Sequence, residues 1–301
     1  EDAQALFDVM VEAKPRLPRL PPADEIIRVS RLIEGLEDGA LLAFEGESPV
    51  GVVTLSNFRD PAVAILMGGV RPDACGRGLG RALLERAEST ALARGCQQLR
   101  ARWFHSDPRA VSFVSAAGFT QKDAMLWSSF ETTSPISAWA LQKEAAMLES
   151  GIRVVSGAEF ELVRPDWDQV WWRHLMDCMH DVPMEIPFVE LPFETWRPLI
   201  EPPLMDRSRV LVALDGDVMV GLMYLGAVFH EKANIDHTSV ASAYRRRGIS
   251  TMLKCAAVRR AKTSGASAVT TQNHSHNPMF ALNQAFGFCH VDTEADGLKP
   301  L

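Results

Sequence analysis

The feature that most constrains the fold of this chain is an internal repeat with a period of about 170 residues. The segment LLAFEGESPVG at residues 41–51 matches LVALDGDVMVG at residues 211–221. One offset then aligns further pairs along the chain: Val70 with Val240, Arg77 with Arg247, Gly78 with Gly248, Leu83 with Leu253 and Asp107 with Asn277. Because the matches keep their order, the sequence predicts two copies of one folding unit.

The repeat divides the 301 residues into two domains of ordinary size, residues 1–145 and 146–301. The helix-favouring segment 134–150 is the expected connector. Apolar residues make up 47% of the chain and charged residues 23%, which is typical of globular proteins and excludes a wholly disordered or collagen-like chain.

The net charge of −7 gives no reason to expect nucleic acid or an anionic membrane as a partner. No apolar run has the length of a membrane span, and no secretory signal is recognisable. The five cysteines are odd in number and never form a CxxC pair, so we expect reduced thiols and a cytoplasmic protein. The oligomeric state stays open.

Each copy reads as an α/β unit with a mixed sheet and helices on both faces. Glu45-Gly46 and Asp215-Gly216 separate two apolar runs, which predicts a hairpin in each copy. Further strands are expected at 62–70 and 97–104 in the first copy, and at 233–240 and 268–272 in the second. A glycine turn and a helix lie between them, and a short helix and a Gly-Phe strand follow.

The glycine turns are the most informative segments: VRPDACGRGLGRALL at 70–84 and VASAYRRRGISTMLK at 240–254. A helix start presents unpaired backbone N–H groups, and a glycine there lets an anion such as a pyrophosphate approach closely. Arginines add positive charge in both copies: Arg77 and Arg81, then Arg245, Arg246 and Arg247. The alternative is an ordinary turn with solvated arginines. The glycine spacing fits neither a Walker loop nor a dinucleotide fingerprint.

These turns, with the downstream segments DPRAVSFVSAAGF and NPMFALNQAFGF, resemble the acetyl-CoA-binding motifs of GNAT-type N-acetyltransferases. The resemblance covers nearly the whole chain twice, as in tandem GNAT proteins. It implies acetyl-CoA as co-substrate, with its pyrophosphate on the turn amides, and direct attack by an amine on the thioester. The residues it places against the cofactor are Val70, Arg77, Gly78, Leu79 and Gly80, and Val240, Arg245, Arg246, Arg247, Gly248, Ile249, Ser250 and Asn277.

The two copies differ in the strand that precedes each turn. Family members often carry an acidic residue or histidine four or six positions before the motif valine, where alternation puts both side chains on one face. These positions hold Leu66 and Ala64 in the first copy, but Asp236 and Asn234 in the second. Asp236 is therefore the predicted base, directly or through water; the alternative is a carboxylate satisfied by turn amides or a cation. A bulge would bring His237 to the reactive face instead.

Both copies also depart from the family pattern. Cys75 and Ser250 replace usual motif residues. The tyrosine that often protonates the leaving thiolate is replaced by Val114 and by Asn283, which can donate a hydrogen bond but not act as an acid. Asn277 is expected to cap the short helix or to bind the pantetheine arm.

Three other patterns have competing interpretations. His274 and His276 form H-x-H, but with no third ligand we expect a polar loop and no metal. Trp167, Trp171 and Trp172 have the spacing of a core helix. The segment 181–206 is acidic at Glu185, Glu190, Glu194 and Glu201, where the first copy has Lys14, Arg16 and Arg19. This contrast favours a cationic acceptor in the second copy, unless these charges are simply solvated.

The sequence thus predicts an N-acetyltransferase whose second copy acetylates a primary amine of a small molecule. The first copy would be structural, or would hold a second coenzyme A without turnover. The alternatives are a non-catalytic acyl-CoA-binding or scaffolding protein, and catalysis in the first copy.

Overall fold

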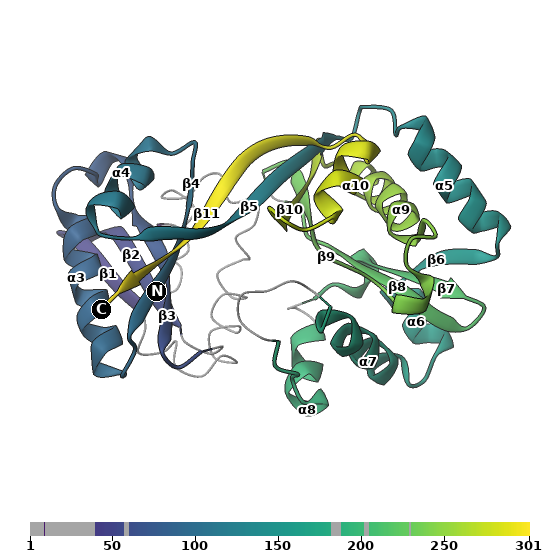
Figure 1. Ribbon diagram of the computed structural model, residues 1–301, viewed down its shortest axis with the longest axis horizontal. Coiled ribbons are helices and arrows are strands. Elements are labelled where there is room, and N and C mark those ends of the chain that lie inside the picture. Colours follow the sequence, from purple (N-terminus) through teal and green to yellow (C-terminus); the bar gives the residue numbers. More distant parts are fainter. Residues whose placement is uncertain (1–8, 10–39, 57–59, 182–187, 202–204, 229) are drawn as a thin grey trace. The chain divides into compact units, whose positions relative to one another are not determined.

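The computed structural model describes residues 9, 40–56, 60–181, 188–201, 205–228 and 230–301 (Figure 1). The chain forms two compact units. Unit 1 comprises Glu1–Met125 with Asp292–Leu301, and unit 2 comprises Leu126–Val291. Each unit combines a mixed sheet with helices, which confirms the predicted α/β class and the two copies.

Unit 1 has the strand order β1-β2-β3-β4-β11-β5. The pairs β1–β2, β2–β3 and β4–β11 are antiparallel, and β3 and β4 are parallel. Its elements are β1 (Ala40–Glu45), β2 (Ser48–Ser56), β3 (Val63–Val70), the 3-10 turn η1 (Pro72–Ala74), α3 (Leu79–Ala93), β4 (Gln98–Phe104), α4 (Pro108–Ala116), the start of β5 (Thr120–Glu131) and the end of β11 (Cys289–Pro300).

Unit 2 has the strand order β5-β10-β9-β8-β7-β6, with β9 and β10 parallel. Its strands are the end of β5, β6 (Ile152–Ser156), β7 (Val210–Asp215), β8 (Val218–Leu225), β9 (Lys232–Val240) and β10 (Ala268–His274). Its helices and 3-10 turns are α5 (Ala138–Glu149), α6 (Gly157–Val163), α7 (Trp167–Met179), α8 (Phe193–Trp196), η2 (Arg197–Ile200), η3 (Arg207–Arg209), η4 (Ser242–Tyr244), α9 (Ile249–Thr263) and α10 (Met279–Phe286).

Both predicted hairpins form. The β1–β2 loop begins at Gly46 and the β7–β8 loop at Gly216, with φ of 63° and 57°. These left-handed values favour glycine, since a side chain is strained there, so the Glu-Gly and Asp-Gly pairs fix the turns. The predicted connector contains α5.

The last strand of the chain belongs to the first unit. Residues of β11 pair antiparallel with β4, from Glu294 opposite Phe104 to Pro300 opposite Gln98. Asp296, which is 2% exposed, accepts hydrogen bonds from Arg100 at 2.7 Å and from Arg102 at 3.0 Å. The two units therefore differ from the expected domains 1–145 and 146–301. A repeat period shows which residues correspond, but not which sheet the final strand joins.

The sheet of unit 2 lies between two apolar layers, with α9 on one face and α7 on the other (Figure 1). On the α7 side, Trp171 is fully buried and contacts both Trp167 and Trp196. Trp172 is half-buried and donates to the Leu191 carbonyl. The core interpretation of this tryptophan helix is thus confirmed. None of the described helices has the length and apolarity needed to cross a bilayer.

Candidate functional site

The two glycine turns have the same backbone shape. Gly76 and Gly78 have φ of 81° and 86° in unit 1, and the matching residues Arg246 and Gly248 have φ of 62° and 120° in unit 2. The backbone N–H groups of residues 76–81 and 246–251 have no acceptor in the described part of the chain. Each turn therefore offers free donors at the positive end of α3 or α9, which suits an anionic ligand.

The arginines of the second turn are only partly available. The Nε of Arg245 donates to the Val240 carbonyl at 3.0 Å, and its Nη2 lies 2.6 Å from the carboxylate of Asp181. Arg247 stacks on the Tyr244 ring at 4.9 Å, and Arg246 is exposed. In unit 1, Arg77 binds Glu45 at 2.8 Å, and Cys75 takes the place of Arg245.

The two turns differ in their surroundings, because the connector helix α5 lies beside the turn of unit 2. A side chain added at Gly248 would lie 3.5 Å from Met147 and 3.6 Å from Lys143, both on α5. At Gly78 the same atom would meet none of the described residues within 4 Å. The turn of unit 2 therefore has α5 on one side, in contact through Met147 and the Cβ and carbonyl oxygen of Lys143.

The strands that lead into the turns separate from their neighbours. β9 pairs with β10 from Lys232 to Ile235, and β3 pairs with β4 from Val63 to Leu66. Beyond these pairs, residues 236–240 and 67–70 continue without a partner on that edge within the described chain. Their backbone groups are thus open to an extended ligand that carries amides.

A β-bulge lies where β9 leaves β10. Tyr224 on β8 is opposite His237, but Leu225 is opposite Ile235, so Asp236 is the extra residue. Ile235 and Val240 consequently both join the α9-side core despite their odd spacing. In a regular strand His237 would lie on the face opposite Asn234; the bulge instead brings it to the side of Tyr224. β3 is regular, with paired residues from Gly51–Val70 to Ser56–Ile65.

At the bulge, the candidate bases Asp236 and His237 both contact residues of the α7 side, which are Asn234 and Tyr224. The Nδ2 of Asn234 donates to Asp236 at 2.7 Å. The His237 ring lies 5.2 Å from the Tyr224 ring, and its buried Nε2 has no hydrogen-bond partner among the described residues. Burial, with a smaller effect from His174, lowers the pKa of His237 to about 4. Its imidazole is therefore neutral at pH 7.

Sequence reasoning missed two residues on this face. The His174 Nε2 on α7 lies 3.1 Å from the Ser239 hydroxyl on β9, and both side chains are buried. Burial lowers the pKa of His174 to about 4. Ser239 follows His237 by two residues, so strand alternation was the available signal; nothing local marks His174.

The polar residues after β10 have mixed outcomes. Asn283 is fully buried, and its Nδ2 already donates to Asn273 at 2.6 Å, so it does not face solvent as a free donor. Asn277 lies one residue before Pro278, the N-cap of α10, and its side-chain oxygen accepts from the Met279 amide at 2.9 Å. The rings of His274 and His276 lie 5.7 Å apart. The described chain contains no group of three or more potential metal ligands.

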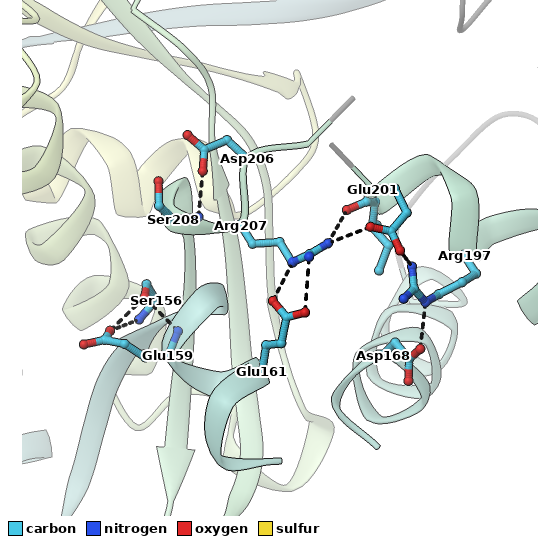
Figure 2. Close-up of polar contacts among 10 residues, drawn as sticks. Ser156, Glu159, Glu161, Asp168, Arg197, Glu201, Asp206, Arg207 and Ser208 are labelled. Atoms are coloured by element: carbon cyan, nitrogen blue, oxygen red, sulfur yellow. Dashed lines mark hydrogen bonds and ion pairs between the residues drawn. The ribbon is translucent and has the colours of Figure 1, made fainter. Parts of the chain in front are cut away.

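Acidic residues of the segment 181–206 form ion pairs with neighbouring side chains, and those of Glu201 are drawn in Figure 2. Arg207 bridges Glu161 and Glu201, and Arg197 bridges Glu201 and Asp168. The hydrogen bond from Arg197, with that from Arg207, lowers the pKa of Glu201. Glu190 pairs with His180 at 2.7 Å, whereas Glu194 is exposed. Glu185, Lys14, Arg16 and Arg19 lie outside the described residues.

A comparison with known protein families identifies the same two copies. The family model described as Acetyltransferase (GNAT) family matches residues 4–119 and again 169–288. The chain therefore belongs to the GNAT acetyltransferase family, and it carries two copies of that domain. None of the curated proteins matches it.

Solved structures show the same fold at low identity. The GCN5-related N-acetyltransferase from Sphaerobacter thermophilus is 18% identical, with a TM-score of 0.68 over 99% of this chain and 92% of that one. The tandem GNAT protein from the clavulanic acid biosynthesis pathway, solved without AcCoA, is 18% identical, with a TM-score of 0.69 over 99% and 94%. A putative acetyltransferase from Pyrococcus horikoshii is 13% identical, with a TM-score of 0.55 over 100% and 86%.

Proposed function

We propose that unit 2 transfers an acetyl group from acetyl-CoA to a primary amine of a small molecule. The observation that carries this proposal is the bulge at Asp236. It gives unit 2 a carboxylate and a neutral imidazole at the point where β9 separates from β10. Unit 1 has Leu66 and Met67 at the same two positions.

The residues present fit acetyl-CoA. Free amides in an exposed, arginine-rich turn suit a diphosphate, and the open edge of β9 suits the amides of a pantetheine arm. The residues that would hold the cofactor in unit 2 are Val240, Arg245, Arg246, Arg247, Gly248, Ile249 and Ser250. Asn277, whose side-chain oxygen accepts from the Met279 amide, would bind the pantetheine arm through its remaining amide group.

Bound acetyl-CoA supplies an activated acetyl group: the amine nitrogen bonds to the thioester carbon as the carbon–sulfur bond breaks. Asp236 takes the proton that the attacking ammonium must lose, directly or through one water. His237 is neutral and offers its unpartnered Nε2 to the acceptor, which makes it the reserve base. Because Asn283 is not an acid, the proton for the departing thiolate comes from solvent.

Unit 1 is proposed as a structural copy, or as a second coenzyme A site without turnover. Its turn is more open than that of unit 2, since no described residue lies within 4 Å of a side chain added at Gly78, but its strand offers no proton acceptor at Ala64 or Leu66. On the next strand, Arg100 and Arg102 are engaged by Asp296. The proposed cytoplasmic location is supported by the five free cysteines.

A second candidate is a non-catalytic acyl-CoA-binding protein. The observation that favours it is the lack of an acid at the tyrosine position of either copy, where Val114 and Asn283 stand.

One assay separates the two candidates. Thiol release from acetyl-CoA is measured over a panel of primary amines, for the wild type and for Gly78→Glu and Gly248→Glu in parallel. A carboxylate in the working turn repels the diphosphate, so Gly248→Glu should abolish release and Gly78→Glu should not. Asp236→Asn should lower kcat by about 100-fold or more with acetyl-CoA binding retained. Binding without release in the wild type would instead support the second candidate.

A further inference from the structure

A chain of side-chain hydrogen bonds runs to Asp236 from two neighbouring strands. The hydroxyl of Thr270 on β10 donates to Asn234 Oδ1 at 3.0 Å, and Asn234 Nδ2 donates to Asp236 Oδ1 at 2.7 Å. The same Nδ2 lies 3.3 Å from Gln272 Oε1. Thr270 is 4% exposed and Asn234 is 2% exposed. A buried amide is thus fixed between a hydroxyl and a carboxylate.

The direction of this chain is chemically specific. A carboxamide has a donor end and an acceptor end, and its oxygen is occupied by the Thr270 hydroxyl. The donor end therefore faces Asp236, where it stabilises the ionised form of the carboxylate. Asp236 is the extra residue of the bulge, so its cross-strand partner on β8 is missing, and a side-chain tether restricts its orientation.

Unit 1 has no equivalent of this chain. In the sheet pairing, Ile65 and Arg100 take the places of Asn234 and Thr270, and the bulge residue Asp236 has no counterpart in β3. Arg100 binds Asp296 of β11 instead. The hydrogen-bonded chain is thus restricted to the copy that has the bulge.

We infer that Asn234 is a positioning residue for acyl transfer: it holds the Asp236 carboxylate ionised and oriented, and Thr270 fixes the direction of the Asn234 amide. Only the use of Asp236 as a base rests on the proposed function. Among the described residues, the titratable groups on this face include His237, Tyr224 on β8, and His174 and Cys178 on α7. Both histidines are neutral above pH 5, and burial raises the pKa of Tyr224 and of Cys178, so none of these four groups changes charge between pH 5 and 8.

The test is an NMR titration of the full chain carrying carboxyl-labelled aspartate, with Asp236→Asn used to assign the signal. The midpoint of the Asp236 titration should rise by about one pH unit in Asn234→Ala, because a donor to the charged form is lost. Thr270→Val should raise it by less. Thr271→Val is the matched control, since that buried hydroxyl donates to the Ile235 carbonyl instead and should leave the midpoint unchanged.

Asn234→Asp provides a second variant of the same shape. A carboxylate in place of the donor should raise the midpoint further than Asn234→Ala does. An unchanged midpoint in Thr270→Val and Asn234→Asp would overturn the inference, even if Asn234→Ala does not fold. The titration needs no acceptor amine. Full activity of Asp236→Asn would therefore refute its role as base in the proposed function, while the midpoints would still report on the positioning by Asn234.

Discussion

β3 and β9 occupy the same place in the two copies, but their backbones differ by one residue of register. β3 pairs regularly with β2, and the two strands approach so closely at Gly68 that an added side chain would lie 2.1 Å from the Val52 carbonyl. β9 has Thr238 at that position and takes up an extra residue at Asp236. The two units have the same strands at this place. Unit 2 differs by the one-residue change of register, which puts Asp236 and His237 at the point where β9 separates from β10.

The largest expected difference between the copies is at acid pH. His174 and His237 have pKa values of about 4, whereas exposed histidine titrates near 6.5. Between these values the unfolded chain binds protons that the folded chain does not, so the free energy of unfolding falls as the pH decreases from 6.5 to 4. The loss is up to about 3 kcal/mol for each imidazole. Met67, which takes the place of His237 in unit 1, has no such effect.

Urea unfolding at pH 7 and at pH 4.5 measures this loss. It should be smaller in His174→Gln and His237→Gln, and unchanged in the control His276→Gln, whose side chain is exposed. An equal loss in the double variant His174→Gln/His237→Gln and in the wild type would show that these imidazoles are not its source.

A second comparison concerns Lys254, which is 1% exposed in unit 2 where unit 1 has Leu84. Its ammonium lies 5.6 Å from the Phe288 ring, and burial lowers its pKa to about 8. The decrease of the Lys254 pKa from 10.5 to about 8 corresponds to a loss of about 3 kcal/mol in the free energy of unfolding while the ammonium is charged. The contact with the Phe288 ring offsets this loss only in part. Lys254→Leu should therefore stabilise the protein by about 2 kcal/mol at pH 7.

The gain should shrink as the pH rises from 8 to 10.5, because the folded wild type then sheds its buried charge before the unfolded chain does. Thermal unfolding at pH 7 and pH 10 gives both values, and Leu84→Lys is the matched reverse substitution, expected to destabilise unit 1. A Lys254→Leu variant less stable than the wild type at pH 7 would contradict the prediction.

A smaller effect is expected at the turns, where Arg246 adopts the left-handed conformation that Gly76 fills in unit 1. Arg246→Gly should stabilise the fold by about 1 kcal/mol, because it relieves the backbone. It should also weaken acetyl-CoA binding by unit 2, because a cation is lost beside the diphosphate. Denaturation and calorimetry with acetyl-CoA measure the two opposite changes. Arg81→Gly is a control for charge alone, and a gain in both stability and affinity would contradict the assignment of Arg246 to the cofactor.

The smallest effect is expected at Asp181, which pairs with Arg245 at the exposed edge of the second turn. Such ion pairs contribute less than about 1 kcal/mol, so Asp181→Asn should tighten acetyl-CoA binding only a few-fold by releasing Arg245. The gain should decrease with added salt. The exposed Asp217 gives the control Asp217→Asn. Weaker binding by Asp181→Asn would show that the pair helps to hold Arg245 in place.

Local signals predicted most of the fold. Both hairpins and both helix starts follow from residues close together in sequence, and each of them is present. The bulge could not be predicted, because the offset of 170 is unbroken across β9: the extra residue comes from the β8–β9 connection and leaves no insertion in the alignment. The ion pairs from Arg197 to Asp168 and from Arg207 to Glu161 also could not be predicted, because their partners are 29 and 46 residues apart in sequence.

Strand β11 follows unit 2 in the sequence but belongs to unit 1, and this has a consequence for biosynthesis. The first copy leaves the ribosome well before the second, yet its sheet lacks a strand until residues 292–301 have been translated. During that interval the edge of β4 is uncovered and Arg100 and Arg102 lack Asp296. The sheet of the unit that is made first is therefore completed only after unit 2 has been made, and a nascent chain of this protein would benefit from a chaperone that shields β4 until residues 292–301 have emerged.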